Sequence, residues 1–170
     1  MEEYNSRRHP SEKIIFDSMN RDYKTVLQHV EGVLDGETDL TANLANVAAI
    51  LKEMPGYFWV GFYLVKGDEL VLGPFQGPVA CTRIGYGKGV CGTAWKDGKS
   101  VLVPDVDRFP GHIACNSNSK SELVVPIFDG TGKVAMVLDA DSDTLDSFHE
   151  EDRQALEKVA SLISGTLVSE

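Results

Sequence analysis

The chain has 170 residues and a formal net charge of −10, with 26 acidic and 16 basic side chains. This length suits one domain, which buries roughly 70% of its unfolded surface without added cross-links. The acidic balance and the lack of a basic run beyond Arg7-Arg8 disfavour nucleic acid and anionic membrane surfaces as partners.

The chain shows no sign of a membrane or secretory segment. No apolar run approaches the roughly 20 residues that a bilayer needs, and the longest is interrupted at Gly61. No apolar segment follows Arg7-Arg8, so no targeting signal is expected. The number of cysteines, three, is odd, which argues against the disulfide framework of a secreted protein. We therefore expect a cytoplasmic protein.

Two helices are expected first. From about Asn20 apolar residues recur with helical spacing, and Gly36 ends the pattern. Asp39, a residue type that caps helices, precedes a second apolar stripe that ends at Pro55-Gly56. Neither apolar face contains a polar cluster, so we interpret both helices as packing elements.

An aromatic strand follows. Residues 57–65 are rich in aromatic and β-branched types, and a short turn leads from them into a second strand over 69–75. Alternation places Trp59, Gly61 and Tyr63 on one face, opposite the core-facing set. Two rings beside a glycine suit the floor of a pocket for an apolar or sulfur-bearing group, with room above the glycine. An ordinary half-buried aromatic face explains the pattern equally well.

All three cysteines lie in a stretch rich in glycine and proline. Cys81 is expected in a short strand, Cys91 in a short helix over 90–96, and Cys115 in a long loop over 105–121. The glycine-rich loop before the helix has neither a Gly-Lys-Ser/Thr sequence nor a βαβ unit, which disfavours phosphate binding. Cys91 has either a lowered pKa near the helix N-terminus or a packing role as a small buried side chain.

The C-terminal part is expected to be a strand over 100–104, a hairpin of strands over 122–128 and 133–139, and a last helix. The hairpin runs out into the sequence DADSD, which is typical of a solvated strand end or a cation-binding turn. Ser147 and Glu150 match the capping box of the last helix. The core face of that helix is expected to consist of Leu156, Val159, Ala160, Ile163 and Leu167.

These elements do not alternate as in a parallel α/β protein. They indicate an α+β domain with a mainly antiparallel sheet of about six strands, N- and C-terminal helices on one face, and a loop-covered pocket on the other. We expect a polar N-terminal arm over 1–18 and the domain over 19–170. The apolar faces of the first and last helices would also allow a homodimer.

Metal binding is one interpretation of the cysteines. Cys81, Cys91, Cys115 and His112 offer four ligands, but the cysteines form no C-x-x-C pair. A structural zinc site is therefore disfavoured, and we expect no bound metal.

Thiol redox chemistry fits the loop placement better. A thiolate that attacks an electrophilic sulfur or oxygen becomes a sulfenic acid, which a second cysteine converts to a disulfide. An acid is needed if oxygen is to leave. Glu122, Asp139, Asp141 and Asp143 are candidates, because clustered carboxylates can hold one of their number protonated near neutral pH.

Six segments then carry a family resemblance. They are WVGFY at 59–63, GPFQGPVAC ending at Cys81, GKGVCG around Cys91, VPDVDRFPGHIAC ending at Cys115, SELVVP from Ser121 and LDADS from Leu138. In this order they resemble the free methionine-(R)-sulfoxide reductases, small single-domain proteins with the GAF fold. The resemblance runs from about residue 20 to the end and implies a single GAF domain.

The resemblance implies a redox role for each cysteine. Cys115 corresponds to the nucleophile on the sulfoxide sulfur, Cys81 to the residue that resolves its sulfenic acid, and Cys91 to an accessory or alternative disulfide partner. Thioredoxin or an equivalent dithiol then reduces the disulfide, and no cofactor is bound. One residue departs from the pattern: Asn116 follows the nucleophile where family members often have aspartate, which changes the charge beside the thiol but removes no assigned role.

The resemblance also assigns the pocket. Glu122, Asp139 and Asp141 correspond to carboxylates that hold the ammonium group of free methionine sulfoxide and help protonate the departing oxygen. Trp59 and Tyr63 correspond to aromatic residues that shape the pocket around the side chain. The expected function is therefore reduction of free L-methionine-(R)-sulfoxide. The rival is a GAF sensor module that binds a small molecule without turnover, usually beside an output domain, for which we expect no room in this chain.

Overall fold

A computed structural model describes residues 20–167 of the chain, so the expected arm over 1–18 lies outside the described residues. The helices are α3 (Tyr23–Leu34), α4 (Leu40–Lys52), α5 (Gly89–Asp97) and α6 (Glu150–Thr166), with a short 3-10 turn η1 (Val106–Arg108). The strands are β1 (Trp59–Lys66), β2 (Glu69–Gln76), β3 (Arg83–Gly85), β4 (Val101–Val103), β5 (Ser121–Phe128) and β6 (Val134–Ser142).

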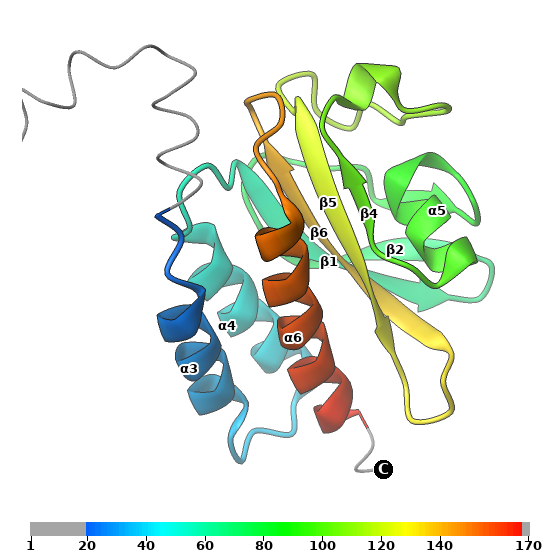
Figure 1. The fold of residues 1–170 in the computed structure, drawn as a ribbon. Helices are drawn as coiled ribbons and strands as arrows, with labels where there is room; N and C mark the ends of the chain where they lie inside the picture. The colour runs from blue at the N-terminus through cyan, green and yellow to red at the C-terminus, as the bar shows by residue number, and fades with distance from the viewer. Residues whose placement is uncertain (1–19, 168–170) are drawn as a thin grey trace, which may run out of the picture.

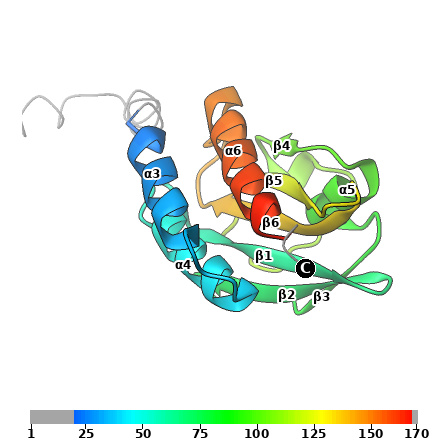
Figure 2. The same cartoon turned by 90° about the horizontal axis from the view of Figure 1, so that it is seen from below.

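The strands form one sheet of six in the order β3-β2-β1-β6-β5-β4, with every neighbouring pair antiparallel. Helices α4 and α6 pack on one face of this sheet, and α3 packs against both helices (Figures 1 and 2). Helix α5 lies across the other face. The α+β architecture expected from the sequence is confirmed. No helix among residues 20–167 has the length and apolar character to cross a bilayer.

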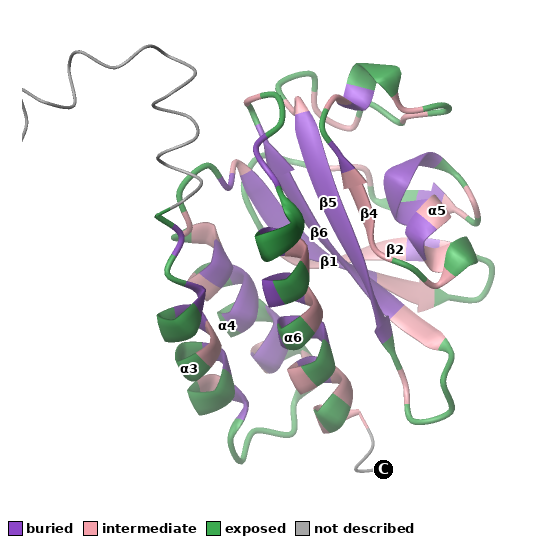
Figure 3. Cartoon of the chain, viewed as in Figure 1, coloured by how far each residue is buried: buried purple, intermediate pink, exposed green. Residues whose placement is uncertain are grey.

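The main core lies between the sheet and the three long helices. It includes Val30 of α3, Leu44 of α4, Phe62 of β1, Leu138 of β6 and Ile163 of α6, all of which are fully buried. Figure 3 shows the central strands β1, β5 and β6 largely buried and the outward faces of the helices exposed. The apolar stripes of the first and last helices are therefore used within the chain itself.

The N-terminal ends of the first two described helices follow the sequence pattern. Asp39 caps α4, because its carboxylate accepts a hydrogen bond of 2.8 Å from the backbone N–H of Ala42. Asp22 caps α3 in the same way through the N–H of Thr25. These acceptors satisfy N–H groups that have no partner inside the helix.

The capping box of α6 was predicted two residues too early. His149 is the cap, and its backbone N–H donates to Asp152 Oδ2 at 2.7 Å, so Ser147 and Glu150 do not form the box. Ser147 is instead held by Arg21, which donates to its carbonyl at 2.9 Å and to its hydroxyl at 3.1 Å. The arginine also pairs with Asp152 at 2.8 Å. A contact from the far end of the chain therefore sets the start of this helix.

The register of the three central strands brings the polar residues together. In β1 and β6, Trp59 lies opposite Asp141 and Gly61 opposite Asp139. In β5 and β6, Glu122 lies opposite the same Asp141. Directly opposed residues share a face of a sheet, so the aromatic and acidic side chains project together, away from the long helices.

The acidic run at the end of β6 is not the solvated strand end that its composition suggests. Asp139 and Asp141 are only 6% and 9% exposed, and both belong to the strand. Asp143, two residues further on, is exposed. The composition was misleading because β1 and β5 flank the end of β6 and α5 covers it, which sequence spacing does not show.

Candidate active site

The pocket lies on the face of the sheet that α5 covers. Seven of the eight residues assigned from the sequence line it: Trp59, Tyr63, Cys91, Cys115, Glu122, Asp139 and Asp141. The eighth, Cys81, is bonded to one of these lining residues. Strands β1, β5 and β6 supply the floor, α5 supplies one wall, and the connections before β3 and before β5 supply the rim.

Cys81 and Cys115 form a disulfide, although they are 34 residues apart in the chain. Their Cα atoms lie 5.2 Å apart, and both residues are half-buried. Cys81 precedes β3 by two residues, so its expected position within a strand is wrong. A disulfide sulfur is no longer the thiolate that zinc requires. The fourfold set with Cys91 and His112 therefore does not form a zinc site in this state.

The two aromatic residues of the floor also hold the connection that carries Cys81. Trp59 Nε1 donates to the carbonyl of Pro78 at 3.0 Å, and the hydroxyl of Tyr63 donates to the carbonyl of Cys81 at 2.9 Å. The expected room above Gly61 is absent, since a Cβ there would lie 2.3 Å from Cβ of Phe75. The aromatic face thus serves both as floor and as an anchor for one of the bonded cysteines.

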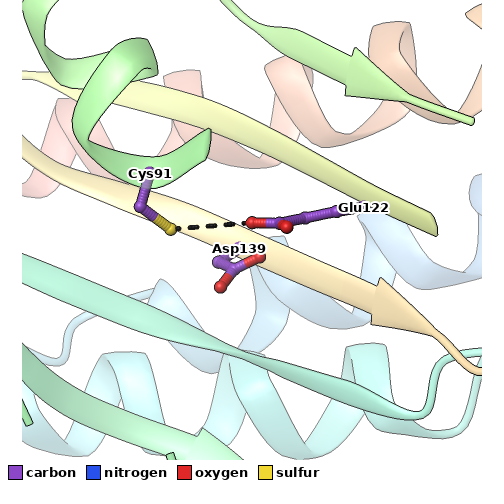
Figure 4. A group of neighbouring side chains, drawn as sticks. All are labelled: Cys91, Glu122 and Asp139. Atoms are coloured by element: carbon purple, nitrogen blue, oxygen red, sulfur yellow. Dashed lines mark hydrogen bonds between the residues drawn. The ribbon is translucent and has the colours of Figure 1, made fainter. Parts of the chain in front are cut away.

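Cys91 faces the carboxylates from the first turn of α5 (Figure 4). Its Sγ lies 3.9 Å from Oε1 of Glu122, and one carboxylate oxygen of Asp139 completes a group whose atoms all lie within 4.8 Å of one another. Burial, with the charges of these carboxylates, raises the pKa of the Cys91 thiol. A lowered pKa is therefore wrong for this cysteine, and the alternative of a buried side chain is confirmed.

The three carboxyl groups are buried together, and each is harder to ionise than in water. Burial raises the pKa of Glu122 well above its usual range, and the charges of Asp139 and Asp141 raise it further. Burial and the charge of Asp139 raise the pKa of Asp141, against a hydrogen bond from Ser119. Burial raises the pKa of Asp139 to about 6. The pocket therefore retains protons on carboxyl groups at neutral pH.

One carboxylate oxygen has no partner. Asp139 Oδ1 is buried and makes no hydrogen bond. A buried acceptor without a donor costs about 1–3 kcal/mol, and such atoms indicate a place for a ligand. The pocket thus combines proton donors, a free acceptor and an apolar floor.

His112 was considered in the sequence only as a metal ligand, and it is a pocket residue. Its Nε2 lies 3.8 Å from Oε2 of Glu122, and its side chain is 14% exposed. Burial lowers the pKa of this imidazole, which therefore stays neutral at neutral pH. Its position three residues before Cys115 was the one signal in the sequence that could have placed it near the thiol.

Asn116 also lines the pocket, and it forms a turn that the usual aspartate would form as well. Its Oδ1 accepts a hydrogen bond of 2.9 Å from the backbone N–H of Asn118 and closes a small turn after Cys115. Asparagine and aspartate both form this turn. The replacement removes a charge and keeps the local backbone.

Comparison with known proteins gives a consistent assignment. The model of the GAF domain family matches residues 39–167. GAF domain-containing protein A of Dictyostelium discoideum is 55% identical over 147 residues, which cover 86% of this chain and 92% of that protein. Free methionine-R-sulfoxide reductase of Saccharomyces cerevisiae is 42% identical over 151 residues, which cover 84% of each.

A solved structure agrees with these relatives. The X-ray structure of free methionine-R-sulfoxide reductase from Neisseria meningitidis, in complex with its substrate, superimposes with a TM-score of 0.83. It is 55% identical in sequence, and the match covers 85% of this chain and 87% of that chain.

Proposed function

Since the chain belongs to the GAF domain family and is a free methionine-R-sulfoxide reductase, an oxidoreductase that acts on a sulfur group, we propose how its residues reduce free L-methionine-(R)-sulfoxide to L-methionine. Cys115 is the nucleophile, Cys81 resolves the oxidised thiol, and a dithiol such as thioredoxin restores both. The disulfide between these cysteines, at the rim of a pocket with buried acids, is the observation that carries this proposal.

The substrate's polar groups bind to the acidic end of the pocket. Asp139 and Asp141 accept hydrogen bonds from the ammonium group, which supplies the donor that Asp139 Oδ1 lacks. The sulfur-bearing side chain lies against the rings of Trp59 and Tyr63, because sulfur and aromatic rings attract each other. A residue within a polypeptide chain has no free α-ammonium group, so this arrangement favours the free amino acid.

Sulfoxide reduction begins when the Cys115 thiolate attacks the sulfoxide sulfur. The oxygen takes a proton from a carboxylic acid and moves to the cysteine, so the sulfoxide sulfur is reduced and the cysteine becomes a sulfenic acid. Glu122 is the proposed donor, because its raised pKa keeps it protonated at neutral pH. The group lines the same pocket as the nucleophile.

The second thiol then completes the redox step. Cys81 attacks the sulfenic acid of Cys115, water leaves, and the disulfide forms. Two thiols of thioredoxin reduce this disulfide by exchange. Cys91 remains an accessory partner, because its buried thiol has a raised pKa and is a poor nucleophile. We assign the reaction to the cytoplasm, where such dithiols keep cysteines reduced.

The homodimer remains a prediction without a defined surface. The apolar stripes of α3 and α6 that suggested it are packed inside the chain. A dimer would therefore have to use another surface.

The test is turnover of the resolved R and S epimers of free methionine sulfoxide with thioredoxin or dithiothreitol, followed by methionine release. We expect turnover of the R epimer alone, its loss in Cys115→Ser, and its retention in the exposed control Asp143→Asn. Full activity of Cys115→Ser would refute the assigned nucleophile. Binding of methionine sulfoxide without turnover by the reduced protein would favour the GAF sensor alternative.

A further inference from the structure

We propose that Cys91, Glu122 and Asp139 form a binding site for a thiophilic divalent cation, with Zn²⁺ as the natural occupant, and that this cation excludes the substrate. The cation-binding part stands on geometry alone. The part about substrate exclusion rests on the function proposed above. The site uses the one cysteine that the disulfide leaves free among the three in the chain.

The three ligand atoms lie close to one another. Cys91 Sγ and Glu122 Oε1 are 3.9 Å apart, and every pair that includes Asp139 is within 4.8 Å (Figure 4). Zinc–sulfur and zinc–oxygen bonds of about 2.3 and 2.1 Å place tetrahedral ligand atoms about 3.5 Å apart. Small side-chain rotations, which bring the ligand atoms about 1 Å closer, therefore close the site.

The unpartnered oxygen of Asp139 also points to a ligand. Asp139 is only 6% exposed, it lines the pocket, and its Oδ1 has no hydrogen-bond partner. A divalent cation satisfies this atom without needing a donor hydrogen. The sulfur ligand selects the metal class, because magnesium and calcium prefer oxygen ligands and zinc accepts sulfur and oxygen together.

Glu122 is oriented for this role by its neighbours. Its Oε1 faces Cys91 and its Oε2 faces His112 Nε2 at 3.8 Å. Three protein ligands leave a fourth position to water, as in open zinc sites.

The lining of the pocket favours a cation, because it includes the carboxyl groups of Glu122, Asp139 and Asp141. The basic side chains that line it are Lys88 and His112. A cation bound to Asp139 occupies the place proposed for the substrate's ammonium group.

The test uses Co²⁺ as a spectroscopic probe on the oxidised protein. Cys91 is then the only thiol, so a sulfur-to-cobalt charge-transfer band has one source. We expect this band in the wild type and in Asp143→Asn, its displacement by Zn²⁺, and its absence in Cys91→Ser. Asp139→Asn should weaken Co²⁺ binding by at least about tenfold. A wild type without the band, or unchanged binding in Asp139→Asn, overturns the site.

Substrate exclusion is measured separately, as methionine released in a single turnover of prereduced protein from which the dithiol has been removed. We expect added Zn²⁺ to suppress this release and excess substrate to restore it. Undiminished release at saturating Zn²⁺ refutes the exclusion but leaves the Co²⁺ result standing. A protein that binds Co²⁺ as expected and releases no methionine without metal contradicts the proposed function instead.

Discussion

Replacement of Asp139 by asparagine tests whether the buried acids of the pocket lower the free energy of unfolding. Burial raises the pKa of Asp139 from 3.8 to about 6. At about 1.36 kcal/mol per pKa unit, ionisation of this one group in the folded protein costs about 3 kcal/mol. Asp139→Asn removes the cost and keeps the size of the side chain.

The sign of the pH dependence follows from the raised pKa. Below the ordinary value of 3.8 the carboxyl is protonated in both the folded and unfolded states, so it contributes no cost. The free-energy cost of ionising Asp139 grows as the pH rises from 3.8 and is nearly complete above about pH 6. The variant should therefore exceed the wild type by only about 0.5 kcal/mol near pH 4 and by about 3 kcal/mol near pH 8.

Urea unfolding of the oxidised proteins at both pH values measures this difference. Asp143→Asn is the matched control, because the same change four residues along removes an exposed carboxylate. Its stability difference from the wild type should be near zero at both pH values. A gap between Asp139→Asn and the wild type that is equal near pH 4 and near pH 8 would refute the electrostatic reasoning.

Two further substitutions test the aromatic floor. Gly61→Ala places a Cβ 2.3 Å from Phe75 Cβ and should lower the free energy of unfolding by about 1–3 kcal/mol. At Gly165 an added Cβ meets no atom within 4 Å beyond its own helix. Gly165→Ala should therefore stabilise α6 by up to about 1 kcal/mol. Urea unfolding measures the opposite effects of the two substitutions. Tyr63→Phe removes the hydrogen bond to the Cys81 carbonyl. It should slow disulfide formation in a single turnover without a matching loss in the first release of methionine, and an equal loss in both steps would contradict this anchoring role.

Local patterns were sufficient for most of the fold. The helical spacing before Gly36, the cap at Asp39 and the aromatic strand after Pro55 each depend on neighbouring residues, and the structure contains α3, α4 and β1 at these places. Alternation also placed Trp59 and Tyr63 on a shared face, which the stacking of their rings 6.0 Å apart confirms.

Features set by distant contacts were not predictable from spacing. Trp59 lies opposite Asp141 because β1 pairs with β6, which is distant in the chain. No periodicity indicates that pairing, and the shared pocket of the aromatic and acidic residues came from the family resemblance. The burial of Asp139 also depends on distant contacts, because β1 flanks β6 and α5 covers it. The room expected above Gly61 was wrong because Phe75 comes from the next strand.

Cys91 shows how burial overrides a local electrostatic expectation. A position in the first turn of a helix suggested a lowered pKa. The side chain is 4% exposed and faces Glu122 and Asp139, so desolvation and like charge raise the pKa instead. Both effects depend on the sheet beneath α5, which the local sequence does not describe.

In the proposed reaction, oxygen passes from the substrate to Cys115. This transfer is tested most directly by trapping the sulfenic acid in a prereduced Cys81→Ser/Cys91→Ser variant, treated once with the R epimer and then with dimedone. We expect about one methionine per chain and a dimedone adduct on Cys115, because no second thiol remains to resolve it. Methionine release without an adduct on Cys115 would contradict the account.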